Sequence, residues 1–145
     1  MGGKQLSVQS DAALCTTSRG NTMKIGCIFC QVHHTVLAES ELSVAVLDSF
    51  PVSKGHALIV PRRHAVTIWE MTPDEYADAF MLVRKVKEVL QKKFEPQGFN
   101  VGVNCGEAAG QSVFHAHIHV IPRYTGDVPM PRGGVRNLMP GKGNY

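Results

Sequence analysis

The sequence predicts an α+β domain in which one long helix packs on a mostly antiparallel sheet. Short β-branched segments follow one another at hairpin-like spacing, and a single long amphipathic stretch interrupts them. No internal repeat is present. The 145 residues are enough for one domain with its own core, and four cysteines are too few for a disulfide scaffold.

The long helix is expected to run from about Pro73 to Lys93. Thr72 is a good N-cap residue, Pro73 suits the first helical position, and Glu75 completes a capping box with Thr72. Apolar residues then recur at spacings of three and four, while charged residues take the other face. The pattern therefore predicts an amphipathic helix with one buried side.

Strands are expected on both sides of this helix. Two of these strands are expected to end at a proline, the third strand at Pro61 and the last strand at Pro122. The polar turn Glu39-Ser40-Glu41 joins the first two as a hairpin. The expected strands are Thr35–Ala38, Ser43–Leu47, His56–Val60, Phe99–Asn104 and Ser112–Ile121.

Composition divides the chain into a disordered leader (1–22), a domain (23–124) and a Gly- and Pro-rich tail (125–145) that should pack on the domain. The net charge of +3 comes from the two ends, because residues 25–122 carry eight basic and ten acidic side chains. This balance argues against a nucleic-acid partner. No apolar run approaches the roughly 18 residues of a membrane span, and no signal core is present, so we expect a cytoplasmic protein without a membrane partner.

Three of the seven histidines alternate with apolar residues in the segment His115–His119. In a strand, side chains two apart share a face, so the three imidazoles should project one way while Phe114 and Ile118 project into the core. A neutral imidazole can attack phosphorus or transfer protons near pH 7. Alternatively, His117 and His119 could chelate a metal in a metal-dependent hydrolase.

The loop before this segment favours the first alternative. Gly106, Gly110, Gln111 and Ser112 can offer backbone N–H groups and short polar side chains to anionic oxygens, as phosphate-binding loops do. Its spacing does not match a P-loop. The combination indicates phosphoryl or nucleotidyl transfer chemistry.

The segment from His115 to Ile121 resembles the His-x-His-x-His motif, followed by two apolar residues, of the histidine triad (HIT) superfamily of nucleotide hydrolases and transferases. The likeness covers about residues 25–124 in order. The resemblance implies a five-stranded antiparallel sheet with one long and one short helix, usually in a homodimer. The tail lacks the Trp-Pro-Pro-Gly ending of the phosphoramidate-hydrolase branch. Ile121-Pro122-Arg123 with Gly126-Asp127 is more similar to the branch that cleaves diadenosine polyphosphates, or to the bacterial HIT proteins near it. Beyond the triad, the likeness rests on Ile28-Phe29, Leu47-Asp48, Gly55–His64, Asn104 and Ala109–Ser112.

The resemblance also implies roles for individual residues. His117 would attack the α-phosphate of a nucleotide and form a nucleotidyl-histidine that water releases. His119 would donate to the phosphate or leaving group, and His56 would orient the triad. Asp48 would accept the ribose hydroxyls. The other implied substrate-binding residues are Ile28, Phe29 and Leu47 around the base and Asn104, Gly110, Gln111 and Ser112 around the phosphate.

Cys27 and Cys30 form a Cys-x-x-Cys pair, which in a reducing compartment is more often a metal or redox site than a disulfide. Tetrahedral zinc needs two more ligands. The spacing alone does not decide whether these ligands are the nearby His33 and His34 or histidines that are distant in the sequence. The resemblance implies His64 and His115, which makes Cys27, Cys30, His64 and His115 a structural zinc site. A nucleotide-binding adaptor with slow turnover is a further alternative to the enzyme.

Overall fold

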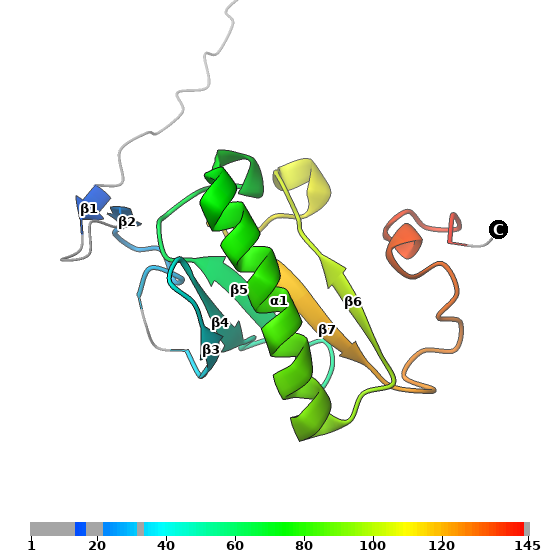
Figure 1. The fold of residues 1–145 in the computed structure, drawn as a ribbon. Coiled ribbons are helices and arrows are strands. Elements are labelled where there is room, and N and C mark those ends of the chain that lie inside the picture. Colours follow the sequence, from blue (N-terminus) through cyan, green and yellow to red (C-terminus); the bar gives the residue numbers. More distant parts are fainter. Residues whose placement is uncertain (1–13, 17–21, 32–33, 144–145) are drawn as a thin grey trace, which may run out of the picture.

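The structure is a computed structural model that describes residues 14–16, 22–31 and 34–143. Its centre is a five-stranded antiparallel sheet in the order β3-β4-β5-β7-β6, and α1 crosses one face of this sheet (Figure 1). This arrangement confirms the predicted fold class. The short helix of that prediction is a single 3-10 turn, η1 (Ile68–Glu70), before α1. The strands are β3 (Val36–Glu39), β4 (Ser43–Leu47), β5 (Ala57–Pro61), β6 (Gly98–Gly102) and β7 (Ile118–Arg123).

Helix α1 (Pro73–Phe94) begins with the capping box expected from the sequence. The Thr72 hydroxyl accepts a hydrogen bond from the Glu75 N–H, and the Glu75 carboxylate accepts one from the Thr72 N–H. Arg63, in the loop after β5, donates two further hydrogen bonds of 2.7 Å to this carboxylate. The start of α1 is therefore fixed to the end of β5, the part of the sheet that borders the histidines. The helix ends at Phe94, and the C-cap residue Glu95 adopts a left-handed conformation.

The main core fills the space between α1 and the sheet. The buried face of α1 presents residues three and four apart, as the apolar period predicts. The sheet contributes residues of β4, β5 and β7 from a single face. The central residues of this core are Ala45, Ala57, Ile59, Ala79, Leu82, Val86, Leu90, Ile118 and Val120.

The last strand begins later than predicted, at Ile118 rather than Ser112. The segment before it is held by other contacts: the Gln111 side chain donates to the Val113 carbonyl, and the Ala116 N–H donates to Ala65. Phe114, predicted to lie in the core, is 41% exposed as a result. The prediction of a continuous strand through the histidines was wrong for its first half.

Pro122 lies inside β7 instead of ending it. β5 pairs with β7 only as far as Val120, so no β5 residue needs a hydrogen bond from the missing N–H of Pro122. On this side the Ser53 hydroxyl donates to the Pro122 carbonyl at 2.6 Å. The proline is tolerated because the ladder on that edge has already ended.

Both ends of the chain contain short elements of secondary structure that the sequence did not predict. β1 (Leu14–Thr16) pairs with β2 (Thr22–Lys24), so the described part of the expected disordered leader forms a short hairpin. The rest of that leader lies outside the described residues. In the tail, the 3-10 helix η3 (Gly134–Leu138) lies beside β6 (Figure 1). No helix in the described ranges combines the length and apolarity that a bilayer span requires.

Candidate active site and metal centre

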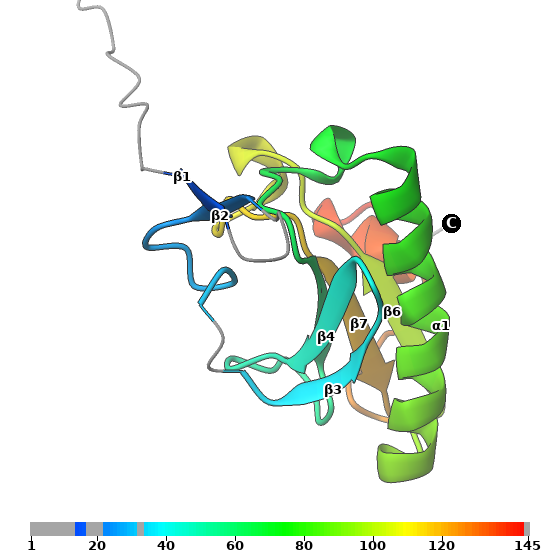
Figure 2. The same cartoon turned by 60° about the vertical axis from the view of Figure 1, so that its left-hand side comes forward.

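The candidate site lies on the face of the sheet opposite α1. Figure 2 shows α1 on one side of the sheet and residues 25–31, which follow β2, on the other. The segment before β7 supplies His115 and His117, and β7 itself supplies His119. His56 immediately precedes β5, and His64 follows that strand. Segments far apart in the sequence therefore converge on two adjacent groups of histidines.

The His117 ring has one nitrogen free for chemistry. Its Nδ1 lies 2.8 Å from the His115 carbonyl oxygen, which can only accept, so Nδ1 carries the proton. The lone pair is then on Nε2. Phe29 packs against the ring at a centroid distance of 5.2 Å, and His119 lies at 5.0 Å. His117 is thus a buried, oriented imidazole whose Nε2 has the electronic structure of a nucleophile.

His56 and His119 form a hydrogen-bonded pair. The Val52 N–H donates to His56 Nδ1 at 3.2 Å, so the neutral His56 ring carries its proton on Nε2 and donates to His119 Nδ1 at 3.0 Å. His119 in turn carries its proton on Nε2. That nitrogen is buried and has no hydrogen-bond partner among the described residues. The Asp48 carboxylate lies 3.4 Å from His56 Nδ1, a longer contact than the Val52 hydrogen bond.

Both rings of this pair are neutral in the free protein near pH 7. Burial lowers the pKa of His119 to about 4, and the neighbouring His117 and His56 act in the same direction. Burial also lowers the pKa of His56, although the Asp48 carboxylate opposes this effect. The pair can therefore take up a proton when an anion binds beside it, because a negative charge favours the protonated form.

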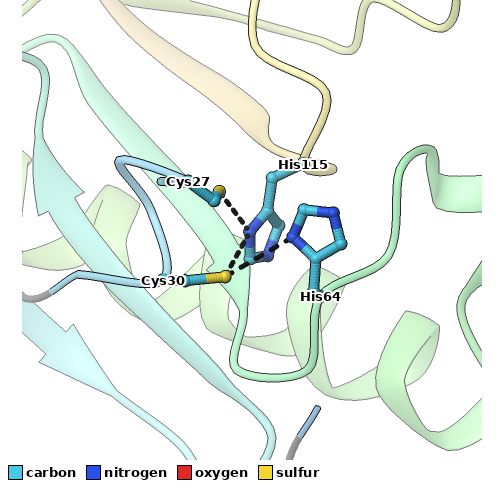
Figure 3. Close-up of side chains that lie close together, drawn as sticks. All are labelled: Cys27, Cys30, His64 and His115. Atoms are coloured by element: carbon cyan, nitrogen blue, oxygen red, sulfur yellow. Dashed lines mark hydrogen bonds between the residues drawn. The ribbon is translucent and has the colours of Figure 1, made fainter. Parts of the chain in front are cut away.

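Cys27, Cys30, His64 and His115 converge as a group, with one ligand atom of each within 4.8 Å of all the others (Figure 3). Cys27 Sγ and Cys30 Sγ lie 3.4 and 3.5 Å from His115 Nδ1, and Cys30 Sγ lies 3.4 Å from His64 Nδ1. The structure therefore brings together the four residues predicted for a metal site. His34 lies apart, with its Nε2 at 3.0 Å from the Ile28 carbonyl, and His33 lies outside the described residues.

His115 is oriented as a metal-binding histidine would be. Its Nε2 donates to the Pro61 carbonyl at 2.9 Å, so the Nδ1 lone pair faces the two sulfur atoms. Burial lowers the pKa of His115 to about 4, which keeps the ring neutral. Burial also raises the pKa of the Cys30 thiol. A cation among these atoms would reverse that effect by stabilising the thiolate.

Gln111 has a different role from the phosphate contact implied by the resemblance. Its Oε1 accepts from the Gly106 N–H at 2.8 Å, and its Nε2 donates to the carbonyls of Val66 and Val113 at 2.6 and 3.1 Å. Both amide hydrogens are therefore used. Gln111 is buried and holds the loop in shape, which leaves its side chain no hydrogen for a phosphate oxygen.

The other residues predicted to bind phosphate, Gly110, Ser112 and Asn104, do not all line the same cavity. Gly110 ends the 3-10 turn η2 (Glu107–Ala109) with φ +84°, a conformation that favours glycine. Ser112 is exposed, and its N–H and hydroxyl make no hydrogen bond within the described chain, so both can bind an anion. Asn104 lines a cavity together with His56 and His119, whereas Ser112 lines a smaller one together with Cys27 and His64.

The apolar slot proposed for a base needs one correction. Phe29 and Val44 both pack against the buried cluster of Val46, Leu58 and Val60 on the side of the sheet away from α1. Leu47 follows Val46 directly, so strand alternation turns it to the α1 side. Val46 was not predicted from the sequence, but it lies on the same side of the sheet as Phe29, and the alternation within β4 was the signal for it. Ile28 is 52% exposed and lines the smaller cavity that Cys27 and Ser112 also line.

Comparison with known proteins identifies the family to which the chain belongs. The HIT domain matches residues 30–126, and the chain therefore belongs to the HIT family. It is 41% identical over 104 residues to the adenosine 5'-monophosphoramidase of Schizosaccharomyces pombe, covering 68% of this chain and 75% of the relative. It is 39% identical over 92 residues to the asymmetrical bis(5'-nucleosyl)-tetraphosphatase of the same organism, covering 63% of this chain and 50% of that relative.

Solved structures agree with this assignment. A HIT family protein from Bacillus anthracis superimposes with a TM-score of 0.67 at 40% identity, covering 71% of this chain and 77% of the other. A zinc-bound histidine triad family protein from Mycobacterium smegmatis gives a TM-score of 0.66 at 30% identity, covering 70% and 78%.

Proposed function

We propose that this protein is a nucleotide hydrolase that cleaves at the α-phosphate through a nucleotidyl intermediate on His117. The observation that carries the proposal is the pair of oriented rings: His117 has its lone pair on Nε2, and the His119 Nε2–H has no hydrogen-bond partner in the described part of the chain. Relatives named as a monophosphoramidase and a nucleosyl tetraphosphatase support the same class of reaction.

The reaction then takes two steps at phosphorus. His117 Nε2 forms a bond to the α-phosphorus as the bond to the leaving group breaks. The bound phosphate favours one added proton on the His56 and His119 pair, and His119 Nε2 passes this proton to the leaving group. In the second step water attacks the phosphorus, its proton returns to the pair, and the electron pair of the breaking bond returns to Nε2. The products are a nucleoside monophosphate and the protonated leaving group.

Positioning of the phosphate falls to residues that keep free donors. Ser112 offers its N–H and hydroxyl, and Asn104 offers its amide from the cavity that His119 lines. Donors aimed at a developing charge stabilise the transition state more than they stabilise the ground state. Gln111 and Gly110 support these residues by fixing the loop.

Turnover of defined substrates tests the proposal. Adenosine 5'-phosphoramidate and diadenosine tetraphosphate would be incubated with the protein, with and without EDTA, and the acid-quenched protein would be examined for an adenylated histidine. We expect turnover of at least one substrate and an adduct on His117, both unchanged by brief EDTA treatment. Activity lost in EDTA and restored by metal, without any adduct, would instead establish the metal-dependent hydrolase. Tight nucleotide binding without turnover would establish the adaptor.

We also propose that Cys27, Cys30, His64 and His115 hold a structural zinc ion. Zinc bonds of about 2.3 Å to sulfur and 2.0–2.1 Å to nitrogen at tetrahedral angles place sulfur and nitrogen about 3.6 Å apart. The three sulfur to nitrogen distances of 3.4–3.5 Å fit this value. The zinc-bound relative from Mycobacterium smegmatis supports the same choice of metal. The ion would join the loop after β2 to the segment that carries His117.

Asp48 is expected to select ribonucleotides over deoxyribonucleotides. Its Oδ1 accepts from the Phe50 N–H at 2.9 Å, and the remaining lone pairs can accept ribose hydroxyls. We expect the wild type to prefer the ribose substrate by about tenfold or more in kcat/KM, and Asp48→Ala to remove most of this ratio. Loss of the Asp48 contact to His56 affects both sugars equally, so it cancels in the ratio. Equal wild-type rates on the two sugars would show that Asp48 is only a strand-end residue.

We further propose a homodimer. Among the described strands, β6 pairs only with β7, so its outer edge has unpaired backbone groups, and Val101 on this strand is 39% exposed. A second copy would cover this edge in a symmetric pair. Light scattering at micromolar concentration is expected to give twice the chain mass, and a monomer mass would refute the proposal.

A further inference from the structure

We propose that Cys27 and Cys30 form an oxidation-sensitive switch: a peroxide oxidises Cys27, Cys30 converts the product to a disulfide, and the resulting loss of zinc loosens the turn that holds Phe29 against His117. This inference rests on the zinc site proposed above, and its effect on turnover rests on His117 as the nucleophile. It assigns a site of covalent modification and a route by which the redox state reaches that nucleophile.

The two cysteines lie close enough for a disulfide. The Cys30 N–H donates to the Cys27 carbonyl at 3.1 Å, which closes a β-turn. The ends of such a turn have Cα atoms less than about 7 Å apart, and a disulfide needs a separation of about 4.4–6.8 Å. The two sulfur atoms lie within 4.8 Å of each other, and Figure 3 shows both beside the His115 ring. A disulfide can therefore form without unfolding of this part of the chain.

The two sulfur atoms differ in their access to solvent. Cys27 is partly exposed and lines a cavity of about 300 Å³. This cavity opens to solvent, because Ile25 and Gly26 in its wall are exposed. Cys30 is 5% exposed, and its Sγ lies against His115. A peroxide can reach Cys27 from the cavity, so Cys27 reacts first and Cys30 acts as the resolving thiol.

The surroundings of the pair favour the thiolates that this reaction needs. Lys24 lines the same cavity as Cys27, and its backbone N–H donates to Cys30 Sγ at 3.4 Å. When bound, zinc would hold both sulfurs as thiolates. A cationic group beside a partly exposed cysteine is typical of thiols that react with oxidants. Cys105, in contrast, packs against the main core and lies outside the metal group.

One peroxide molecule supplies the whole oxidation. Cys27 Sγ attacks one peroxide oxygen, the O–O bond breaks, and the other oxygen leaves as water after protonation, which produces a sulfenic acid. Cys30 Sγ then attacks Cys27 Sγ, the S–O bond breaks, and the second oxygen leaves as water. The two thiolates together lose two electrons, and the peroxide gains them. The disulfide has no thiolate to offer a cation, so only two histidine ligands remain and zinc is lost.

The turn between the cysteines carries a ring that contacts the proposed nucleophile. Phe29 packs against the rings of His117 and His115, at centroid distances of 5.2 and 6.0 Å. His115 connects the same groups from the other side. Its Nδ1 faces the sulfur atoms, and its carbonyl oxygen lies 2.8 Å from His117 Nδ1. Both supports of the His117 ring are therefore attached to residues of the metal group.

Oxidation removes the link between these two supports. In the zinc-loaded protein the ion would join the turn that carries Phe29 to the segment that carries His115 and His117. Without the ion, the turn and this segment can shift relative to each other. A displacement of about 1 Å at a reacting group can cost up to about 10²-fold in rate. The disulfide form should therefore turn over substrate more slowly than the zinc form.

Treatment of the zinc-loaded protein with limiting hydrogen peroxide tests the inference. Released zinc would be measured with a chromogenic chelator, the disulfide by peptide mass mapping, and the first oxidised cysteine by trapping with dimedone. We expect about one zinc released for each peroxide consumed, a disulfide between Cys27 and Cys30, and a dimedone adduct on Cys27 at early times. Turnover of adenosine 5'-phosphoramidate or diadenosine tetraphosphate, whichever the untreated protein cleaves, should fall by about tenfold or more. A thiol reductant and added zinc should restore it.

Cys105→Ser is the matched control, because it removes a thiol outside the metal group. Its rate of zinc release under peroxide should stay within about twofold of the wild-type rate. In Cys30→Ser the oxidised Cys27 should persist and accumulate the dimedone adduct, because no second thiol resolves it. Trapping in the wild type measures the same order of reaction if this variant does not fold.

Three outcomes would overturn the inference in different ways. If peroxide oxidises Cys105 while zinc stays bound and Cys27 and Cys30 stay reduced, the zinc site stands and the switch is wrong. If the disulfide forms and zinc is lost without a change in turnover, the coupling to His117 is wrong. If the untreated protein holds no zinc, the zinc proposal fails together with the inference. Zinc release and the disulfide are measured without substrate, so they judge the switch even where the proposed hydrolase fails.

Discussion

Replacing His117 by asparagine is expected to lower kcat by about 10³-fold or more, while nucleotide affinity stays within about tenfold of the wild type. Asparagine can still donate a hydrogen bond toward the His115 carbonyl, but it has no nitrogen lone pair to attack phosphorus. The loss should therefore fall on the chemical step and not on binding. Single-turnover kinetics and calorimetric titration with adenosine monophosphate measure the two quantities separately.

His34→Asn is the matched control for this variant. His34 packs beside Phe29, as His117 does, but its ring nitrogen contacts the Ile28 carbonyl and not the triad. We expect its kcat to stay within about threefold of the wild type. Near-normal turnover by His117→Asn would remove His117 as the nucleophile. Equal losses in both variants would indicate general damage to this face of the sheet.

The local chemistry of the sequence predicted the elements that position the site. The capping box at Thr72 and Glu75 and the apolar period after it located α1 to within one residue at its C-terminus. The resemblance, and not the spacing, selected His64 and His115 as partners of the two cysteines. Spacing could not select them because β5 and the segment before β7 are brought together only by sheet pairing.

The misplaced residues have specific physical causes. Leu47 and Val46 differ by one position in a strand, and a shift of one reverses the face on which a side chain lies. The Gln111 amide faces into its own loop, where positive φ angles at Gly106 and Gly110 place backbone groups to receive it. The tail has no periodic pattern, so its sequence could not show that Val135 borders a cavity beside His119.

Loss of one cysteine from the metal group is expected to remove the zinc and destabilise the domain. Cys30 is 5% exposed, and its sulfur lies within 3.5 Å of nitrogens on two histidines. In Cys30→Ser these groups would remain buried without their cation, at a cost of about 2 kcal/mol or more. For a domain of this size, that loss lowers Tm by roughly 8 °C.

Cys105→Ser supplies the matched control, because Cys105 is a partly buried free thiol outside the metal group. Its zinc content should equal that of the wild type, about one ion per chain, and its Tm should fall by no more than about 3 °C. Elemental analysis and thermal unfolding of Cys27→Ser, Cys30→Ser and Cys105→Ser would be compared in the same buffer. Less than about half an equivalent of zinc in the wild type, together with an unchanged Tm in Cys27→Ser, would exclude a structural zinc. An ion that stabilises the fold must be present in the purified protein, and removal of one of its ligands must lower the Tm.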